Sequence, residues 1–285
     1  MKLEHAHGTL QLDRCAVMGI VNRTTDSFFD PGRMELPERV AHGVELWRQG
    51  AAVLDVGGVK AGPGPQVDES EELARVLPLV EGLRASCEAL ISLETGRVRV
   101  AEAALRAGAA LINDVTSLSN IDLARVCAEH GAALVLMHSG GQLRGRPRSP
   151  RYRDVVKEVL GFWEHAADRA QGAGLKTEQL LFDPGLDFAK TTYHSLELVA
   201  RLDELTTHER PVLAAPSRKD LVGESLALPP DERLEGSLAV TALCVERGAA
   251  MVRAHDVLAT ERVVAMVETV LGRRRPRAAV RGLWD

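Results

Sequence analysis

The sequence predicts a (β/α)₈ barrel, and three observations lead to this fold class. Eight short runs of residues are almost wholly apolar, as parallel strands are when both faces of their sheet are covered. Segments with apolar residues at helical spacing lie between these runs. The chain has 285 residues, and barrels of this kind usually have about 250 residues. We therefore expect eight strand–helix units closed around one core.

The expected strands are spread over the whole chain. They cover residues 15–21, 52–57, 89–94, 110–114, 133–138, 180–184, 211–216 and 250–254. The amphipathic segments between them include 70–84, 98–107, 155–170 and 234–247. A doubly wound open sheet is the alternative, but no G-x-G-x-x-G motif follows the first strand, which weakens it.

A short repeat supports this alternation of helices and strands. The pattern Gly-Ala-Ala followed by apolar residues begins at Gly50, Gly108, Gly131 and Gly248. Glycine after a helix accepts the left-handed conformation that ends it, and the small alanines let the chain turn directly into a buried strand. Four recurrences indicate a repeated αβ unit.

No linker divides the chain, so we expect a single domain over residues 1–285. Residues 1–14 are expected to form an N-terminal extension with a short hairpin that closes the bottom of the barrel. Residues 273–285 form a basic tail, which begins with the cluster RRRPR. We interpret this charge run as a solvated end of the chain.

Composition and charge favour a cytoplasmic globular protein. Hydrophobic residues make up 45% of the chain, and the net charge of −5 gives no reason to expect nucleic acid or a membrane as partner. The first residues lack the apolar segment of a signal peptide, and no later apolar run is long enough to cross a membrane. The cysteines are scattered without a C-x-x-C pair, which favours reduced thiols over a zinc site.

Every expected strand ends in hydrogen-bonding or charged residues. In chain order these are Asn22; Asp55 with Gly57-Gly58; Glu94-Thr95; Asn113-Asp114; His138; Asp183; Ser217-Arg218-Lys219; and Arg253 with His255-Asp256. The active sites of (β/α)₈ barrels lie at the carboxyl ends of the strands. We therefore expect these side chains to share one polar cup.

The residue types in this cup indicate the ligand that it suits. The groups fit to bind the edge of a heterocycle are Glu94, Asn113 and Asp183. The cationic groups, which come from the last two strands, are Lys219, Arg253 and His255. Such barrels often bind phosphate at their last strands. A planar heterocycle carrying a phosphate or diphosphate is therefore the expected ligand.

Some of these residues also have a purely structural interpretation. We expect Asp55 to hold the neighbouring loop by hydrogen bonds rather than to contact a ligand, and His138 to line the site or support it. Asp114 fits a turn cap as well as a binding residue. Asp183 lies in an Asp-Pro-Gly sequence typical of turns, yet a turn alone does not account for Lys190 on the same loop.

The motifs at these strand ends resemble those of dihydropteroate synthases, over residues 15–270. MGIVNRTTDSF at 18–28 is similar to the opening motif of that family. Further similar motifs follow in the family's order: LDVGG at 54–58, INDV at 112–115, FDPG at 182–185, SRK at 217–219 and RAHDV at 253–257. Several motifs in register make this a resemblance to the family as a whole.

The resemblance implies an enzyme of folate biosynthesis that joins 6-hydroxymethyl-7,8-dihydropterin diphosphate to p-aminobenzoate and releases pyrophosphate. It implies a homodimer, packed through late helices near 234–247 and 262–271. It also implies Mg²⁺ and no organic cofactor. A metal and fixed cations would stabilise the negative charge that grows on the departing pyrophosphate.

The resemblance also implies the roles of individual residues. The pterin pocket is expected to contain Glu94, Asn113, Asp183 and Lys219. Phe188 and Ser217 are expected near p-aminobenzoate. The diphosphate is expected to be held by Asn22, Arg253 and His255, with Asn22 as the metal ligand. The catalytic residues are expected to be Lys219, Arg253 and Asp183.

The chain departs from the family pattern on its working loops. After the second strand the family has Glu-Ser-Thr-Arg-Pro-Gly, whereas this chain has VKAGPG at 59–64, so the arginine expected at the diphosphate is Gly62. Arg23 replaces a valine in the first loop. The third strand ends in Glu94 instead of aspartate, and the family's Gly-Phe-Gly-Lys is DFAK at 187–190.

Two interpretations of these departures follow. In the first, Arg23 and Lys60 replace the missing arginine as substrate-binding cations, and the condensation survives. In the second, the pterin end persists while the changed loops no longer build the p-aminobenzoate site. Loss of one charge-stabilising group costs about 10²- to 10³-fold in rate, and lysine lacks the planar fork of arginine.

The VKAG loop is similar to that of a divergent second-copy branch of the family. We therefore favour a paralogue with weak, absent or altered synthase activity. One alternative is a non-catalytic pterin- or anion-binding protein, and another is a transferase that acts on a different anionic substrate. A pterin-dependent methyltransferase module would require a cobalamin-binding partner or domain.

Overall fold

Eight parallel strands form one closed sheet in the computed structural model, which describes residues 1–22, 35–59, 67–140, 150–207 and 210–281. The strands are β3 (Ala16–Asn22), β4 (Val53–Gly57), β5 (Leu90–Glu94), β6 (Leu111–Asp114), β7 (Ala133–Met137), β8 (Leu180–Asp183), β9 (Leu213–Ala214) and β10 (Met251–Ala254). Neighbours follow the order β8-β7-β6-β5-β4-β3-β10-β9. The two ends of this series meet, because the Phe182 amide donates to the Pro211 carbonyl at 3.0 Å and Phe182 pairs with Val212. The predicted barrel is thereby confirmed.

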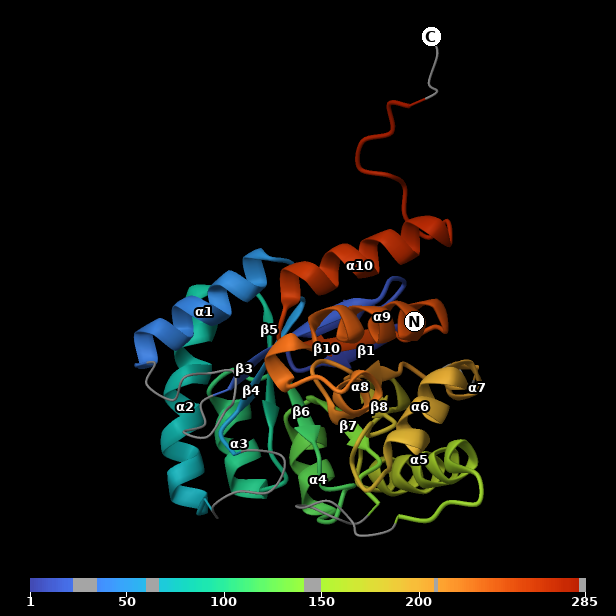
Figure 1. Cartoon of the computed structure of the whole chain (residues 1–285). Coiled ribbons are helices and arrows are strands. Elements are labelled where there is room, and N and C mark those ends of the chain that lie inside the picture. The colour runs from blue at the N-terminus through green and yellow to red at the C-terminus, as the bar shows by residue number, and fades with distance from the viewer. Residues whose placement is uncertain (23–34, 60–66, 141–149, 208–209, 282–285) are drawn as a thin grey trace.

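Helices surround the strands, as Figure 1 shows. They are α1 (Leu36–Arg48), α2 (Glu69–Ser86), α3 (Val98–Arg106), α4 (Asp122–Glu129), α5 (Val155–Gly172), α6 (Thr192–Ala200), α7 (Leu202–Thr206), α8 (Asp220–Leu226), α9 (Leu234–Glu246) and α10 (Val257–Val270). The expected strands agree with the observed ones except at 211–216, where β9 has two residues. Pro211 and Pro216 flank it, and proline has no amide to donate to a neighbouring strand.

Alternate residues of each strand enter two separate apolar clusters. Leu54 belongs to the larger cluster, between the strands and the helices, whereas Val53 belongs to the smaller cluster inside the barrel. Met18, Leu111 and Met251 join Val53 in the inner cluster. Because side chains alternate along a strand, Asp55 points inward, two residues beyond Val53. The barrel interior thus changes from apolar to polar toward the carboxyl ends of the strands.

Register brings the polar strand ends to one level. Asn22 lies beside Gly57, Gly57 beside Glu94, and Glu94 beside Asn113 on four successive strands. Residues that are paired in neighbouring strands point to the same face of the sheet. These side chains therefore face the same interior space.

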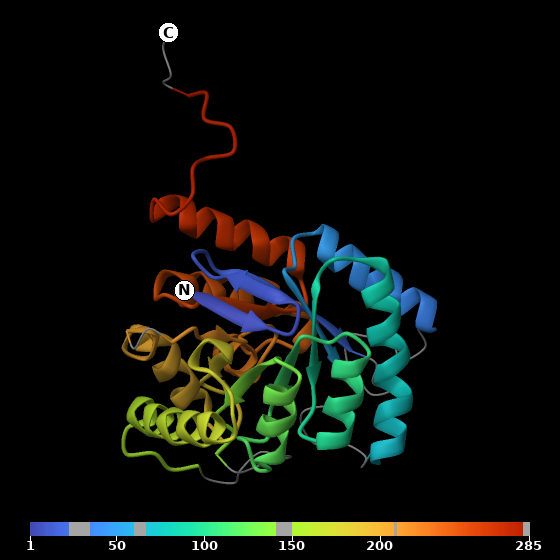
Figure 2. The same ribbon diagram turned by 180° about the vertical axis from the view of Figure 1, so that it is seen from behind.

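An N-terminal hairpin closes the other end of the barrel. Its antiparallel strands are β1 (Lys2–His5) and β2 (Gly8–Gln11). Figure 2 shows the hairpin crossing the middle of the ring of helices. Leu3 and Leu12, only 1% and 3% exposed, join the inner apolar cluster. The hairpin is therefore the floor beneath the polar cup.

Beyond α10 the described chain is mostly exposed and carries the first arginines of the basic tail. Arg274 and Arg277 form ion pairs with Glu261 of α10, at 3.3 and 2.7 Å. Within the described residues, no helix has both the length and the apolar composition needed to cross a bilayer.

We predict that Leu3→Ala lowers the free energy of unfolding by about 2–5 kcal/mol, because it removes buried methyl groups and leaves a cavity in the floor. Urea unfolding followed by circular dichroism measures this change. Thr9→Ala, at an exposed position of the same hairpin, is the matched control and should change stability by less than about 0.5 kcal/mol. Equal stability of Leu3→Ala and wild type would show that the hairpin is not part of the folding core.

Candidate active site

The guanidinium of Arg253 lies between two carboxylates inside the barrel. Its Nε donates to Asp55 Oδ2 at 2.7 Å, and its Nη2 donates to Glu94 Oε2 at 2.7 Å. Asp55 is fully buried, and Glu94 is 9% exposed. A buried carboxylate needs a countercharge. Arg253, from the last strand, supplies it to both.

Asp55 joins further strands to this ion network. Its Oδ1 accepts from Ser92 Oγ at 2.5 Å, and its Oδ2 accepts from Asn113 Nδ2 at 3.0 Å. Asp55 was expected to hold the neighbouring loop, but these partners are side chains of β5 and β6. The reason is register: Asp55 is paired with Ser92, so its side chain points into the barrel beside that residue. Asp55 thus organises the inside of the cup.

Glu94 is a titratable group near neutral pH. Burial raises its pKa to about 7, although the Arg253 charge opposes this shift, and the nearby Asp55 carboxylate adds to it. The family motif has aspartate at this position, so the side chain of Glu94 is longer by one methylene. Burial also raises the pKa of Asp183, an effect that the charges of Lys219 and Arg253 oppose.

Lys219 holds the segment that follows β8. Its Nζ donates to the Leu186 carbonyl at 2.7 Å and lies 4.9 Å from the centre of the Phe188 ring, which permits a cation–π contact. Asp183 begins the same segment, and its Oδ1 accepts from the Gly185 amide at 2.6 Å. Burial lowers the pKa of Lys219, while the carboxylates of Asp183 and Asp187 oppose this shift.

Lys190 fixes the other end of this segment. Its Nζ contacts His138 Nδ1 at 2.9 Å and donates to the carbonyls of His138 and Phe188, both at 3.0 Å. Burial lowers the pKa of Lys190 to about 7 and that of His138 to about 3. Gly185 allows the close approach, because a Cβ there would lie 2.1 Å from the His138 carbonyl oxygen. His138 is therefore a neutral supporting residue.

His255 differs in charge from the sequence expectation. Its Nδ1 lies 3.0 Å from Ser217 Oγ, and its backbone amide donates to the same hydroxyl at 3.2 Å. Burial and then the charge of Arg253 lower the His255 pKa to about 4. The imidazole is therefore neutral at pH 7, whereas the sequence predicted a cation.

Asp114 serves the turn after β6. Its Oδ1 accepts from the amide and the hydroxyl of Thr116 at 2.8 and 2.6 Å, and its Oδ2 accepts from the Leu118 amide at 2.5 Å. Leu118 has φ of 51°, a left-handed conformation that non-glycine residues adopt at a cost. These bonds favour the turn-cap interpretation of Asp114.

The predicted metal ligand, Asn22, lies at the rim on β3. Its Oδ1 is 2.7 Å from the point that a Cβ on Gly57 would occupy, so the two residues are in close contact. Its carbonyl oxygen accepts from Arg39. Arg23 and Lys60, the two cations expected to replace the missing arginine, lie outside the described residues.

The predicted residues on different strands thus surround one space. Hydrogen bonds join Asp55, Asn113, Glu94 and Arg253 directly. The charge of Lys219 opposes the rise in the pKa of both Glu94 and Asp183. Sequence reasoning missed Ser92, although a serine two residues before Glu94 in an apolar strand is the signal of an inward polar position.

Comparisons with known proteins agree with this geometry. A family model described as pterin binding enzyme matches residues 18–255. Inactive dihydropteroate synthase 2 of Mycobacterium tuberculosis is 46% identical over 278 residues, 95% of this chain and 87% of that protein. Dihydropteroate synthase of Escherichia coli is 38% identical over 273 residues, 95% of this chain and 97% of that protein.

A solved structure gives the same result. The crystal structure of Yersinia pestis dihydropteroate synthase in a sulfonamide drug complex matches with a TM-score of 0.91 and 37% identity, covering 96% of this chain and all of that one. The resemblance predicted from the motifs is thereby confirmed. The chain belongs to the pterin binding enzyme family and, within it, to a divergent second-copy branch of dihydropteroate synthase homologues.

Proposed function

We propose that this protein binds the heterocycle of a pterin in the cup and has weak or no dihydropteroate synthase activity. The observation that carries the proposal is the position of Arg253 between Asp55 and Glu94, at 2.7 Å from each. The family resemblance assigns this guanidinium to the diphosphate. Here two of its donors already bind carboxylates, so a diphosphate would have to compete with two buried anions.

The pterin side of the proposal rests on complementary hydrogen-bonding groups. Glu94 and Asp183 offer carboxyl oxygens, and Asn113 offers an amide. The Lys219 ammonium lies 4.9 Å from the centre of the Phe188 ring, and its charge opposes the rise in the pKa of Glu94 and Asp183. A pterin presents ring and exocyclic N–H donors beside acceptors along one edge. Because Glu94, Asn113 and Asp183 are nearly buried, each hydrogen bond to a ligand would form away from water, where an unpaired group is costly.

The anion side is weak among the described residues. Arg218 pairs with Asp256 at 2.8 and 2.9 Å. His255 is neutral near pH 7 because its pKa is lowered to about 4 by burial and the charge of Arg253. Stabilisation of charge in the transition state requires donors that are already aimed at the leaving group. The arrangement therefore supports ring binding better than diphosphate release.

Mg²⁺ fits this site only together with an anionic ligand. Among the described residues, no group of three or more His, Cys, Asp or Glu side chains is placed to hold a metal ion. Asn22 offers one amide oxygen. Mg²⁺ is commonly bound by one or two protein oxygens together with substrate phosphates. We propose that Asn22 contributes to a Mg²⁺ site when a diphosphate is present and that no organic cofactor takes part.

We predict that the purified protein binds a pterin without a diphosphate as tightly as the pterin diphosphate with Mg²⁺, to within about threefold. Isothermal titration calorimetry measures both affinities. Lys219→Ala should weaken binding of the ring by at least about tenfold, because it removes a cation beside Glu94 and Asp183.

A condensation assay with p-aminobenzoate tests the second half of this proposal. We expect a rate at least about 10²-fold below that of an active family member measured in parallel. Rapid dihydropteroate formation that Lys219→Ala abolishes would refute the loss of activity. If the protein binds no pterin, the proposal that its ligand is a pterin is wrong.

We predict that pterin affinity falls about tenfold as pH is lowered from 8 to 6, because the Glu94 carboxyl has a pKa of about 7 and must be ionised to accept a ring N–H. The sign follows from linkage: the ligand binds the ionised form, so protonation of the free protein competes with binding. Glu94→Gln should flatten this pH profile, as calorimetry at several pH values measures. If the pterin affinity of Glu94→Gln still falls with decreasing pH as in the wild type, a group other than Glu94 causes the pH dependence.

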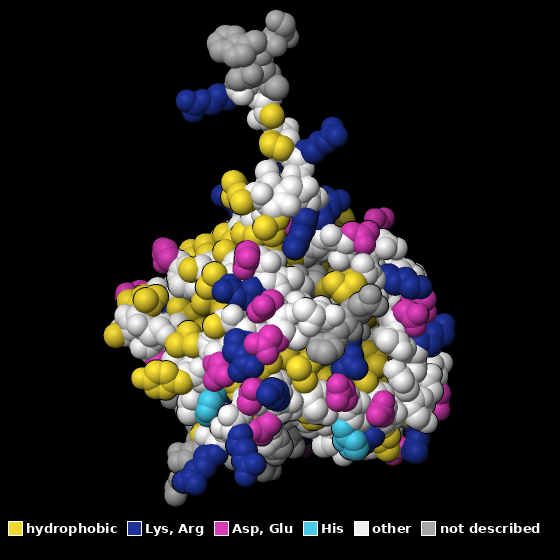
Figure 3. Space-filling model, turned by 90° about the vertical axis from the view of Figure 1, so that its right-hand side faces the viewer, with side chains coloured by type: hydrophobic (Ala, Val, Ile, Leu, Met, Phe, Trp, Pro, Cys, Tyr) yellow, Lys and Arg dark blue, Asp and Glu magenta, His cyan; other side chains and the backbone are white. Residues whose placement is uncertain are grey.

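We further propose a homodimer formed through α9 and α10. Large apolar side chains stay exposed there, with Leu243 at 46%, Met266 at 60% and Val270 at 72%. Figure 3 shows hydrophobic side chains gathered beneath the C-terminal tail. A contiguous apolar surface of this kind is typical of an interface, and the family resemblance names a second copy as the occupant.

We predict that Met266→Glu converts the dimer to a monomer, because it places a charge in an apolar contact. Analytical ultracentrifugation measures the change in mass. Ala41→Glu, at an exposed position of α1, is the control and should leave the mass unchanged. A monomeric wild type at micromolar concentration would contradict the proposed dimer.

A single domain and a cytoplasmic location complete the proposal. All four cysteines are free thiols, and three of them are buried. Reduced cysteines support a reducing compartment. The continuous outer core, which runs from Val17 to Val264, supports one domain.

A further inference from the structure

The segment from Asp183 to Lys190 has an unusual backbone. Asp187 has φ of 67° and Ala189 has φ of 48°, so two residues with side chains occupy the left-handed region on either side of Phe188. The family motif has glycine at both positions. Glycine adopts this conformation readily, whereas other residues need contacts that hold them there. The side chain of Asp187 makes such contacts.

Asp187 ties the segment to two helices. Its Oδ1 accepts from Ser195 Oγ of α6 at 3.0 Å, and its backbone amide donates to the same hydroxyl oxygen at 3.0 Å. Its Oδ2 accepts from the Leu221 amide at the start of α8, at 3.2 Å. Ser195 is fully buried, so its hydroxyl is fixed by packing. A glycine at position 187 would lack both side-chain links.

The residues on either side of Asp187 belong to the cup. Lys219 donates to the Leu186 carbonyl at 2.7 Å and lies 4.9 Å from the Phe188 ring centre. Beyond Phe188, the Tyr152 hydroxyl donates to the Ala189 carbonyl at 2.9 Å. Lys219 immediately precedes α8, whose Leu221 amide binds Asp187. The same carboxylate therefore links both the segment of Phe188 and the helix that follows Lys219.

We propose that Asp187 is a positioning residue, which holds Phe188 and the Lys219 ammonium in their ligand-binding arrangement before a ligand arrives. The contacts of Asp187 alone support the inference that it fixes this segment. Only the identity of the ligand rests on the proposed function. A loop that is already ordered loses less conformational freedom on binding, so the affinity for the ligand rises. The aspartate thus gives rigidity at a position where the family has glycine.

Hydrogen exchange in the ligand-free protein tests the proposal directly. The reporters are the amides of Gly185 and Phe188, which bond to Asp183 and to the Gly185 carbonyl rather than to Asp187. Asp187→Gly should accelerate their exchange by at least about tenfold. Asp187→Asn, which tolerates the left-handed backbone and keeps one acceptor oxygen, should give a smaller increase. Mass spectrometry after peptic digestion measures these rates.

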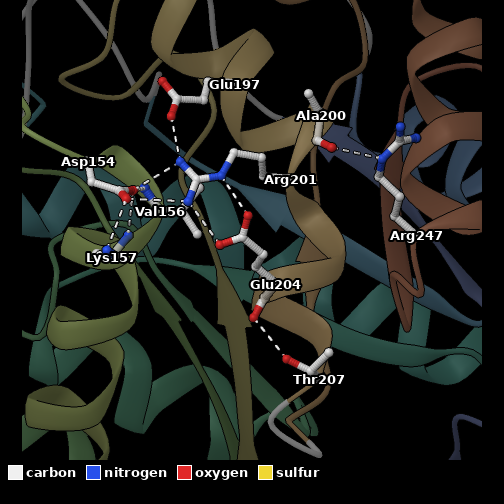
Figure 4. Close-up of polar contacts among 9 residues, drawn as sticks. All are labelled: Asp154, Val156, Lys157, Glu197, Ala200, Arg201, Glu204, Thr207 and Arg247. Atoms are coloured by element: carbon white, nitrogen blue, oxygen red, sulfur yellow. Dashed lines mark hydrogen bonds and ion pairs between the residues drawn. The ribbon is translucent and has the colours of Figure 1, made fainter.

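Two further variants separate positioning from general destabilisation. Ser195→Ala removes the partner of Asp187 on α6 and should reproduce part of the effect, because the Leu221 amide still donates to Asp187. Adding Ser195→Ala to Asp187→Gly should give little further increase. Asp154→Gly is the matched control: its carboxylate also accepts from helix-start amides, those of Val156 and Lys157, and pairs with Arg201 (Figure 4). It should lower stability and leave the reporter amides unchanged.

Ligand binding gives the second readout. Asp187→Gly should weaken the affinity for a pterin about three- to tenfold, and Asp187→Asn should recover part of it. Unchanged exchange of the reporter amides in Asp187→Gly, or equal effects in Asp154→Gly, would overturn the positioning role. A wild-type protein that binds no pterin would overturn the proposed function, and the exchange rates would still decide the role of Asp187.

Discussion

One guanidinium pairs with two carboxylates in the interior of this barrel, and the cup depends on these two ion pairs. Asp55 and Glu94 lie buried on neighbouring strands, close enough for the Asp55 charge to raise the pKa of Glu94. Without Arg253 they would be like charges in a medium that screens poorly. Since Arg253 comes from β10, the last strand of the barrel completes both the sheet and the electrostatics of the site.

These ion pairs bear on the proposed loss of synthase activity. A catalytic cation stabilises a leaving group best when its donors are free and already aimed at it. Here two donors of Arg253 bind Asp55 and Glu94, each at 2.7 Å. Under the proposed function, a diphosphate would have to compete with these two carboxylates for the guanidinium.

The fold could be predicted from the sequence because its signals are local and repeated. A glycine marks the end of a helix before a buried strand at four places: Gly50, Gly108, Gly131 and Gly248. The polar residues at the ends of successive strands predicted the polar cup. Contacts between distant residues could not be predicted in this way. The Arg253–Glu94 pair joins residues 159 positions apart in the chain, and the neutral state of His255 results from burial beside Arg253. The turn-cap role of Asp114 stayed open until its partners were known.

The pairing of β3 with β10, in which Ala16 lies beside Met251, has a consequence for synthesis of the chain. While the ribosome is still adding the later units, β3 has an unpaired edge on the side that β10 will occupy. Open strand edges invite pairing with other chains, and contacts between such distant residues form slowly. We therefore expect the edge of β3 to stay open to such pairing until the final strand has left the exit tunnel.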